Sequence, residues 1–149
     1  MHLNLLRDAK VVRVAAAAAA AQTEVVSAVV DMQGFDSVAF VALLGDVTAT
    51  SVLTLTVKTN SASSTTVPAP VTTTASATFT ADASNADGKA LMVDIHKPRD
   101  RYVFASLTRT VANAAVDGIL AVLYNADERP VAIDASIIAS AFVNDPAAA

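Results

Sequence analysis

Hydrophobic positions in the middle of the chain predict two β-strands around which the other strands are expected to pack. Residues 38–44 form a nearly continuous apolar run after the turn sequence Asp-Met-Gln-Gly. Further on, Leu53, Leu55 and Val57 are interleaved with threonine and lysine. A continuous run is typical of a strand buried on both faces, whereas alternation is typical of a strand with one wet face. Gly45-Asp46 is expected to break the chain between them.

Short β-branched and apolar runs elsewhere predict further strands. They lie at residues 25–32, 77–80, 91–95, 102–107 and 116–124. Pro68 and Pro70 interrupt a Ser/Thr-rich stretch at residues 60–76, which we interpret as a long loop. Seven or more short strands separated by turn signals, without alternating helices, predict an all-β fold, an antiparallel β-sandwich of jelly-roll type.

Both ends of the chain are more ambiguous. Residues 3–21 contain an alanine run at 15–21 with high helix propensity, but the β-branched residues Val11, Val12 and Val14 precede that run. We expect extended structure here, with a short surface helix as the alternative. Residues 131–143 fit either a helical stripe or a buried strand. We therefore divide the chain into an extended N-terminal arm (residues 1–22), a β-sandwich domain (23–143) and a C-terminal tail (144–149).

Composition narrows the possible partners. The 149-residue chain is 54% hydrophobic but only 16% charged, so we expect other chains to cover part of its surface. Its formal net charge of −4 argues against binding nucleic acid, whose phosphates need a basic surface. We expect no membrane partner, because no apolar run reaches the roughly 20 residues of a membrane-spanning helix. Nor do the charged first eight residues resemble a secretion signal.

Candidate chemistry is sparse. The sequence has no cysteine and two histidines, His2 and His96. Asp94 and His96 would share one face of a strand, but no further strong ligand accompanies them, so a hydrogen-bonded histidine is favoured over a metal site. No Gly-x-Ser-x-Gly sequence supports a serine nucleophile, and the four glycines are too scattered to bind phosphate. We therefore expect neither enzymatic activity nor a cofactor.

Two groups of basic residues are the candidate partner interface. The first contains Arg7, Lys10 and Arg13, which suit docking of a basic arm on an acidic surface. The second contains Lys97, Arg99 and Arg101, with Arg109 farther on. Nearby aspartates could instead pair with the second group and order the turn at Pro98.

An ordered series of short motifs resembles a known family. The motifs are Val-Asp-Met-Gln-Gly-Phe-Asp-Ser-Val (residues 30–38), Lys-Pro-Arg-Asp-Arg-Tyr-Val (97–103), Arg-Thr (109–110), Asn-Ala (113–114), Asp-Gly (117–118) and the segment 124–130. The series is similar to tailed-bacteriophage capsid decoration, or cement, proteins. The alanine run and the Ser/Thr/Pro loop depart from that pattern.

The resemblance implies a virion structural protein on the outer surface of the capsid, assembled in the host cytoplasm. Its partners would be the major capsid protein and further copies of itself, as a dimer or trimer. One alternative is a head-completion or tail-tube ring component of the same virion. Another is a carbohydrate-binding jelly roll, for which 5% aromatic residues and no tryptophan offer few stacking platforms.

Overall fold

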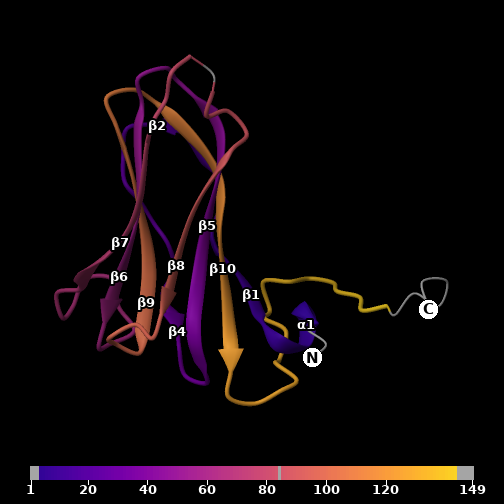
Figure 1. The fold of residues 1–149 in the computed structure, drawn as a ribbon. Helices are drawn as coiled ribbons and strands as arrows, with labels where there is room; N and C mark the ends of the chain where they lie inside the picture. Colours follow the sequence, from indigo (N-terminus) through magenta and orange to yellow (C-terminus); the bar gives the residue numbers. More distant parts are fainter. Residues whose placement is uncertain (1–3, 84, 144–149) are drawn as a thin grey trace.

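Two antiparallel β-sheets packed face to face make up the fold in the computed structural model, which describes residues 4–83 and 85–143 (Figure 1). The elements are α1 (Leu5–Asp8), β1 (Lys10–Ala15), β2 (Ala18–Ala21), β3 (Val25–Val26), β4 (Val30–Asp31), β5 (Phe35–Val47), β6 (Val52–Asn60), β7 (Val71–Thr80), β8 (Ala90–His96), β9 (Tyr102–Thr110) and β10 (Ala114–Ala126). The predicted all-β sandwich is confirmed.

The strand order defines the two sheets. Sheet A has the order β1-β10-β5-β8, and β2 continues the edge beside β10. Sheet B has the order β3-β9-β6-β7, and β4 also pairs with β9. If β1 with β2 and β3 with β4 are each counted as one strand, eight strands lie in two sheets of four. This order is consistent with the predicted jelly-roll type.

The core lies between the sheets, and β6 shows most clearly the alternation that builds it. On β6, Leu53, Leu55 and Val57 are fully buried, whereas Thr54 and Thr56 face outward. The predicted strand with one wet face is therefore confirmed. The largest fully buried side chains of the core cluster are Phe40, Leu53, Leu55, Leu107, Ile119 and Leu123.

The prediction for β5 is only partly correct. The strand passes through Gly45-Asp46 without a break, and β5 and β6 belong to different sheets. Only alternate residues of β5 are in the core: Ala39 and Val41 are half-buried, and Leu43 is 38% exposed. The outward side of the apolar run thus has no protein layer over it within the described residues.

Part of the expected N-terminal arm is paired within sheet A. β1 and β2 both pair with β10, so they form an edge of sheet A (Figure 1). The β-branched residues of β1 suit a strand, and Val14 is in the core. The prediction of extended structure is confirmed for β1 and β2 and wrong for residues 5–8, which form the single helical turn α1.

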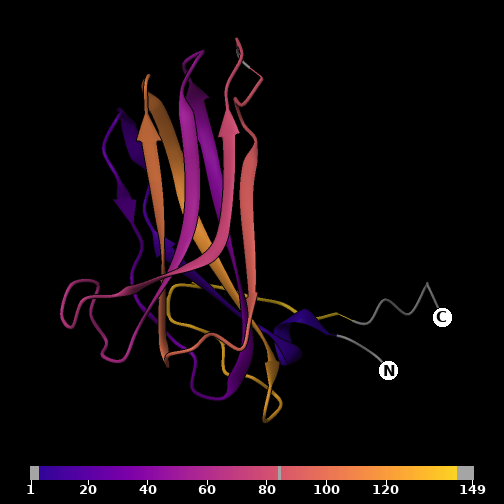
Figure 2. The same ribbon diagram turned by 60° about the vertical axis from the view of Figure 1, so that its left-hand side comes forward.

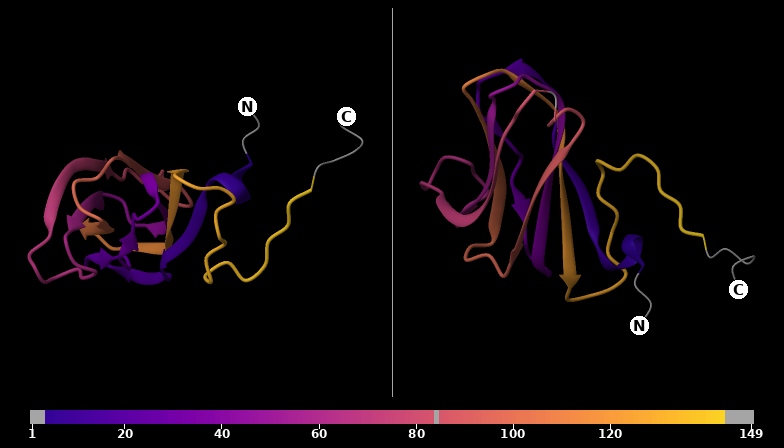
Figure 3. Two further views of the ribbon diagram at one scale, coloured as in Figure 1. Left: turned by 90° about the horizontal axis from the view of Figure 1, so that it is seen from below. Right: turned by 45° about the horizontal axis from the view of Figure 1, so that its top comes forward.

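Two other regions differ from expectation. The Thr-rich residues 71–76 belong to β7, so the predicted loop is limited to residues 61–70, where the Asn60 amide donates to the carbonyls of Ser64 and Pro68. Residues 131–143 contain neither a helix nor a strand. They lie outside the sandwich on the side of β1 (Figures 2 and 3). The tail predicted at residues 144–149 is outside the described residues.

Arg109 ties the edge of sheet A to sheet B. It is 3% exposed and meets no carboxylate in the described chain. Its guanidinium donates to the carbonyls of Thr23, Ala19 and Ala114 at 2.8, 2.8 and 2.6 Å, and to the Thr23 hydroxyl at 2.9 Å. Burial lowers its pKa. The expected pairing of Arg109 with a nearby aspartate is therefore wrong.

Candidate functional site

The first basic group lies along β1 and the turn before it. Lys10 Nζ is 3.8 Å from Asp134, and the Arg13 backbone N–H donates to Ser136 Oγ at 3.0 Å. The Arg7 carbonyl accepts from the Val131 N–H at 2.9 Å. Residues 131–136 therefore run beside β1 in the same direction. Arg7, Lys10 and Arg13 lie along one edge of the sandwich, and Lys10 is engaged within the chain.

The second basic group is divided by its contacts. Arg101 makes two 2.8 Å hydrogen bonds to the Asp31 carboxylate and a third to Gln33, and its guanidinium lies 5.2 Å from the Tyr102 ring centroid. The hydrogen bond from Arg101 lowers the pKa of Asp31. Arg101 thus joins the end of the β8–β9 loop to β4 through Asp31, and not to one of the nearby aspartates that were considered as partners for the turn at Pro98.

Lys97 and Arg99, by contrast, lie exposed in the β8–β9 loop. Neither makes an ion pair within residues 4–83 and 85–143. They line a hollow of about 370 Å³ together with Asp36 and Asp100. This leaves Lys97 and Arg99 available to an outside partner.

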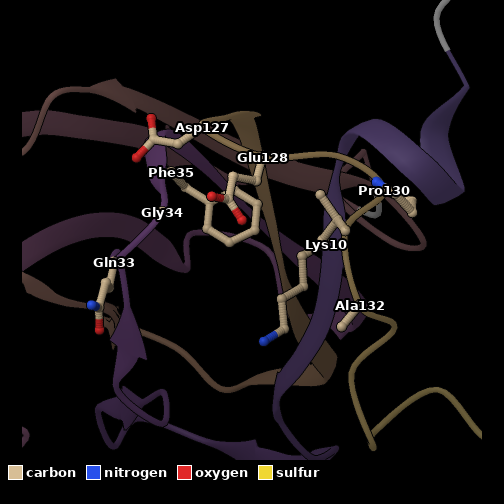
Figure 4. A pocket seen from close by; sticks show the side chains of 9 residues that line it. Lys10, Gln33, Gly34, Phe35, Asp127, Glu128, Pro130 and Ala132 are labelled. Carbon is tan, nitrogen blue, oxygen red and sulfur yellow. The ribbon is translucent and has the colours of Figure 1, made fainter.

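A second hollow, of about 440 Å³, lies where residues 127–132 pass the β4–β5 turn. Its wall includes the Lys10 ammonium, the Phe35 ring and the carboxylates of Asp127 and Glu128 (Figure 4). The Asp127 N–H donates to the Gly34 carbonyl at 2.9 Å and holds the two segments together. Because both charge signs line this hollow, neither an anion nor a cation meets walls of a single sign.

His96 is a hydrogen-bonded residue at a strand end, as favoured above. Ser37 Oγ and His96 Nδ1 are 2.6 Å apart, and the Asn125 amide donates to Ser37 at 3.1 Å. Asp94 instead accepts from the Tyr124 hydroxyl at 2.6 Å, which raises the pKa of Tyr124. The serine, histidine and aspartate thus do not form a catalytic chain of hydrogen bonds. No cluster of metal-ligating residues occurs within the described residues.

The two sheets present different outer faces. The outward residues of β6, β7 and β9 in sheet B are mostly hydroxyl-bearing: Thr54, Thr56, Ser76, Thr78 and Thr108. The outward residues midway along the strands of sheet A are apolar: Val11, Ala39, Val41, Leu43, Ala90, Met92, Leu120 and Val122. We call this second set the apolar face. The continuous apolar run of β5 signalled it, although burial on both faces was expected.

The C-terminal residues 137–143, which we call the C-terminal arm, expose further apolar side chains. Ile138 is fully exposed, and Phe142 and Val143 are 62% and 76% exposed. The arm has no charged residue. The apolar residues of segment 131–143 predicted a packed helix or strand, because no local pattern shows that the sandwich is complete without them.

Comparison with known proteins finds no matching family model and no matching curated protein. No helix in the described part of the chain is long and apolar enough to span a membrane. The resemblance to phage decoration proteins stays a prediction.

Proposed function

We propose that this chain is a virion structural protein that decorates a tailed-bacteriophage capsid and binds the major capsid protein through its C-terminal arm. The ordered motif series that resembles decoration proteins supports the proposal. The observation that carries it is the arm itself: seven uncharged residues outside a finished sandwich, of which Ile138, Phe142 and Val143 have their side chains in solvent.

The arm has a fixed base. Val131 is hydrogen-bonded to Arg7, Asp134 is paired with Lys10, and Arg129 Nε is 3.4 Å from the Asp8 carboxylate. From this base the seven residues can reach at most about 24 Å when fully extended. That length suits a contact across a seam between neighbouring capsid subunits.

Exposed apolar side chains of this size favour burial against another protein. Transfer of a large apolar side chain from water contributes about 1.5–3 kcal/mol. Ordering seven backbone residues opposes this gain by about 1 kcal/mol or more per residue. A single arm should therefore bind weakly, but weak contacts repeated by linked copies over a lattice give strong overall attachment.

Lys97 and Arg99 offer a second, electrostatic contact to the lattice. Both are exposed and carry no ion pair in the described chain, so an acidic capsid surface would attract them without breaking an internal contact. Such a contact is screened by salt, whereas burial of the arm is not.

The test is cosedimentation of the purified chain with capsid shells stripped of their decoration. A chain that ends at Ser136 should lose binding, and Lys97→Glu with Arg99→Glu should weaken binding mainly at low salt. Thr78→Lys, on the outer face of sheet B, is the matched control and should bind like wild type. Full binding by the truncated chain would refute the arm contact.

Copy number separates decoration from the ring alternative. A decoration protein should be present in hundreds of copies in a purified particle, whereas a closed ring supplies only about six or twelve. Quantitative mass spectrometry of virions measures this ratio directly. A count near six would reject decoration even if the arm binds the shell.

A further inference from the structure

The free edge of β7 differs from the other sheet edges. β7 is the last strand of sheet B, and its ten residues include neither a charged residue nor a proline. By contrast, β3 and β4 have only two residues each, β8 carries Asp94, and residues 131–136 run beside β1. Proteins usually protect sheet edges by short strands, charges or covering segments of this kind. Among the strands of residues 4–83 and 85–143, β7 is therefore the long edge without such protection.

Backbone groups on this edge point away from β6. Residues 76–80 pair with β6 without irregularity. The N–H of Ala81, the next residue, donates to the Ser51 carbonyl at 2.8 Å, so the backbone groups of Ala81 point toward β6. This direction alternates along an antiparallel strand. The residues whose N–H and C=O groups point to the open side, where the described chain offers no partner strand, are therefore Ser76, Thr78 and Thr80.

An aromatic ring is left partly uncovered at the same edge. Ala77 and Phe79 share the core-facing side of β7, because side chains alternate along a strand. Ala77 is half-buried against the core, whereas Phe79 is 38% exposed. The opposite side of β7 carries hydroxyl groups, and Thr78 Oγ1 lies 3.2 Å from Thr54 Oγ1. A further strand beside β7 would bury the exposed part of the Phe79 ring.

We propose that β7 pairs with β7 of a second copy of this chain, antiparallel and about a two-fold axis at Thr78. In this register Thr78 lies opposite Thr78 of the second copy, and Ser76 lies opposite Thr80. The three outward-pointing residues of each copy then all lie in hydrogen-bonded pairs. The pairing therefore gives about six new backbone hydrogen bonds.

The core-facing side chains fit the same register. Phe79 of each copy lies opposite Ala77 of the other, in the type of pair where side chains are closest. The small alanine leaves room for the ring, so the two-fold axis covers both rings at once. An axis at Phe79 would instead place the two rings opposite each other. An axis at Ala77 would bring the irregular residues before Ser76 into the ladder.

The pairing closes after two copies. The opposite edge of sheet B is formed by β3 and β4, which are too short to accept a strand of this length. Five residues of one strand span only about 17 Å. The interface is therefore smaller than the roughly 800 Å² per partner of a stable complex, and the Kd of the free protein should be on the order of 100 μM. The inference goes beyond the proposed function and does not depend on it.

Sedimentation velocity of the full chain from about 5 to 500 μM tests the dimer. Wild type should shift from monomer to dimer. Thr78→Pro should weaken the dimer at least tenfold, because proline lacks the outward N–H, whereas the fold tolerates proline where an edge N–H faces solvent. Thr78→Val is the matched control, because it keeps the N–H and should dimerise like wild type. A monomer throughout the range, a trimer, or equal loss in both variants would overturn the proposal.

Charged variants at Thr78 test the two-fold axis. Thr78→Lys and Thr78→Asp should each weaken the dimer at least tenfold, since residue 78 faces itself and like charges directly opposite each other repel. An equimolar mixture of these two variants should form a heterodimer at least tenfold tighter than either homodimer. Absence of this gain in the mixture would overturn the register.

Hydrogen exchange of the wild-type chain tests the same register without a substitution. As concentration rises through the Kd, the amides of Ser76, Thr78 and Thr80 should exchange at least twofold more slowly. The amides of Ala77 and Phe79 should change less, because they are already bonded to β6. Unchanged exchange at Thr78, where sedimentation shows dimer, would place the contact elsewhere and overturn the pairing.

Two variants separate this proposal from the proposed function. The chain that ends at Ser136 keeps β7 and should dimerise like wild type while losing shell binding. Thr78→Lys keeps the C-terminal arm and should bind shells while losing the dimer. A truncated chain that is monomeric would assign the dimer contact to the arm and overturn the β7 pairing. Normal dimerisation together with normal shell binding by the truncated chain would reject only the proposed role of the arm.

Discussion

Replacing Arg109 by methionine should cost this protein a large part of its stability. Methionine keeps an unbranched side chain of similar length but removes the charge and every hydrogen-bond donor. Three backbone carbonyls and one hydroxyl would lose their donor. These acceptors come from Ala19, Thr23 and Ala114, so the substitution also releases the edge of sheet A from β9.

The cost follows from which acceptors water can reach. Ala114 is fully buried, and an unsatisfied buried carbonyl costs about 1–3 kcal/mol. Ala19 and Thr23 are exposed residues, so their carbonyls can be rehydrated and should cost less. The relief from no longer burying a cation offsets part of the loss. We expect a net destabilisation of about 3 kcal/mol.

Urea denaturation followed by circular dichroism measures this change. With an m-value of about 2 kcal/mol/M, the midpoint should fall by about 1.5 M. Arg99→Met is the matched control, because Arg99 is exposed and makes no ion pair in the described chain, and it should stay within about 0.5 kcal/mol of wild type. Arg109→Lys should recover part of the loss, since its ammonium can still donate to some of the carbonyls.

Hydrogen exchange locates the effect. In Arg109→Met, the amides of β2 and of the start of β10 should exchange faster than those of β6, because only the former lose the tie to Arg109. A midpoint within 0.3 M of wild type, or uniform acceleration across both sheets, would show that the carbonyl contacts do not hold the edge.

Three further outcomes follow from single contacts. The hydrogen bond from Arg101 lowers the pKa of Asp31. The Asp31 carboxylate therefore stabilises the folded state above its ordinary pKa, and this stabilisation is lost as pH falls through the lowered pKa. Acid titration of the free energy of unfolding should show this loss in wild type and not in Asp31→Asn. Because the pKa of Tyr124 is raised, this residue stabilises the folded state below the ordinary tyrosine pKa, and the stabilisation is lost as pH rises through the raised pKa. Absorbance titration should show one of the two tyrosines ionising at higher pH than usual, and Asp94→Asn should remove this difference. Phe40→Ala should cost about 3–5 kcal/mol by calorimetry, because Phe40 is fully buried between the sheets.

The strands were predictable where local pattern and burial agree. Leu53, Leu55 and Val57 alternate with polar residues, and that period alone places them in the core. Extended structure at the N-terminus also followed from β-branched residues. What the pattern could not reveal is the pairing with β10, because hydrogen bonding to a strand about 100 residues away leaves no local signal.

The candidate sites were less predictable for the same reason. The basic residues could be recognised as a group, but their partners could not, because a partner can be far away in the sequence. Arg101, for example, binds Asp31, which is 70 residues away. Residues 131–143 have the composition of a core element yet lie outside the sandwich, because eight strands already fill both sheets. The apolar run of β5 predicted burial of both faces of the strand, but a single chain buries only one of these faces.

The position of residues 131–136 beside β1 affects how easily the protein can aggregate. An unshielded edge strand invites other chains to add to the sheet without limit, which is a route to fibres. Ser136 occupies the outward N–H of Arg13, and the Val131 N–H occupies the carbonyl of Arg7 just ahead of the strand. Residues 131–136 thus protect the β1 edge of sheet A from open-ended strand addition, which favours closed association between copies over fibres.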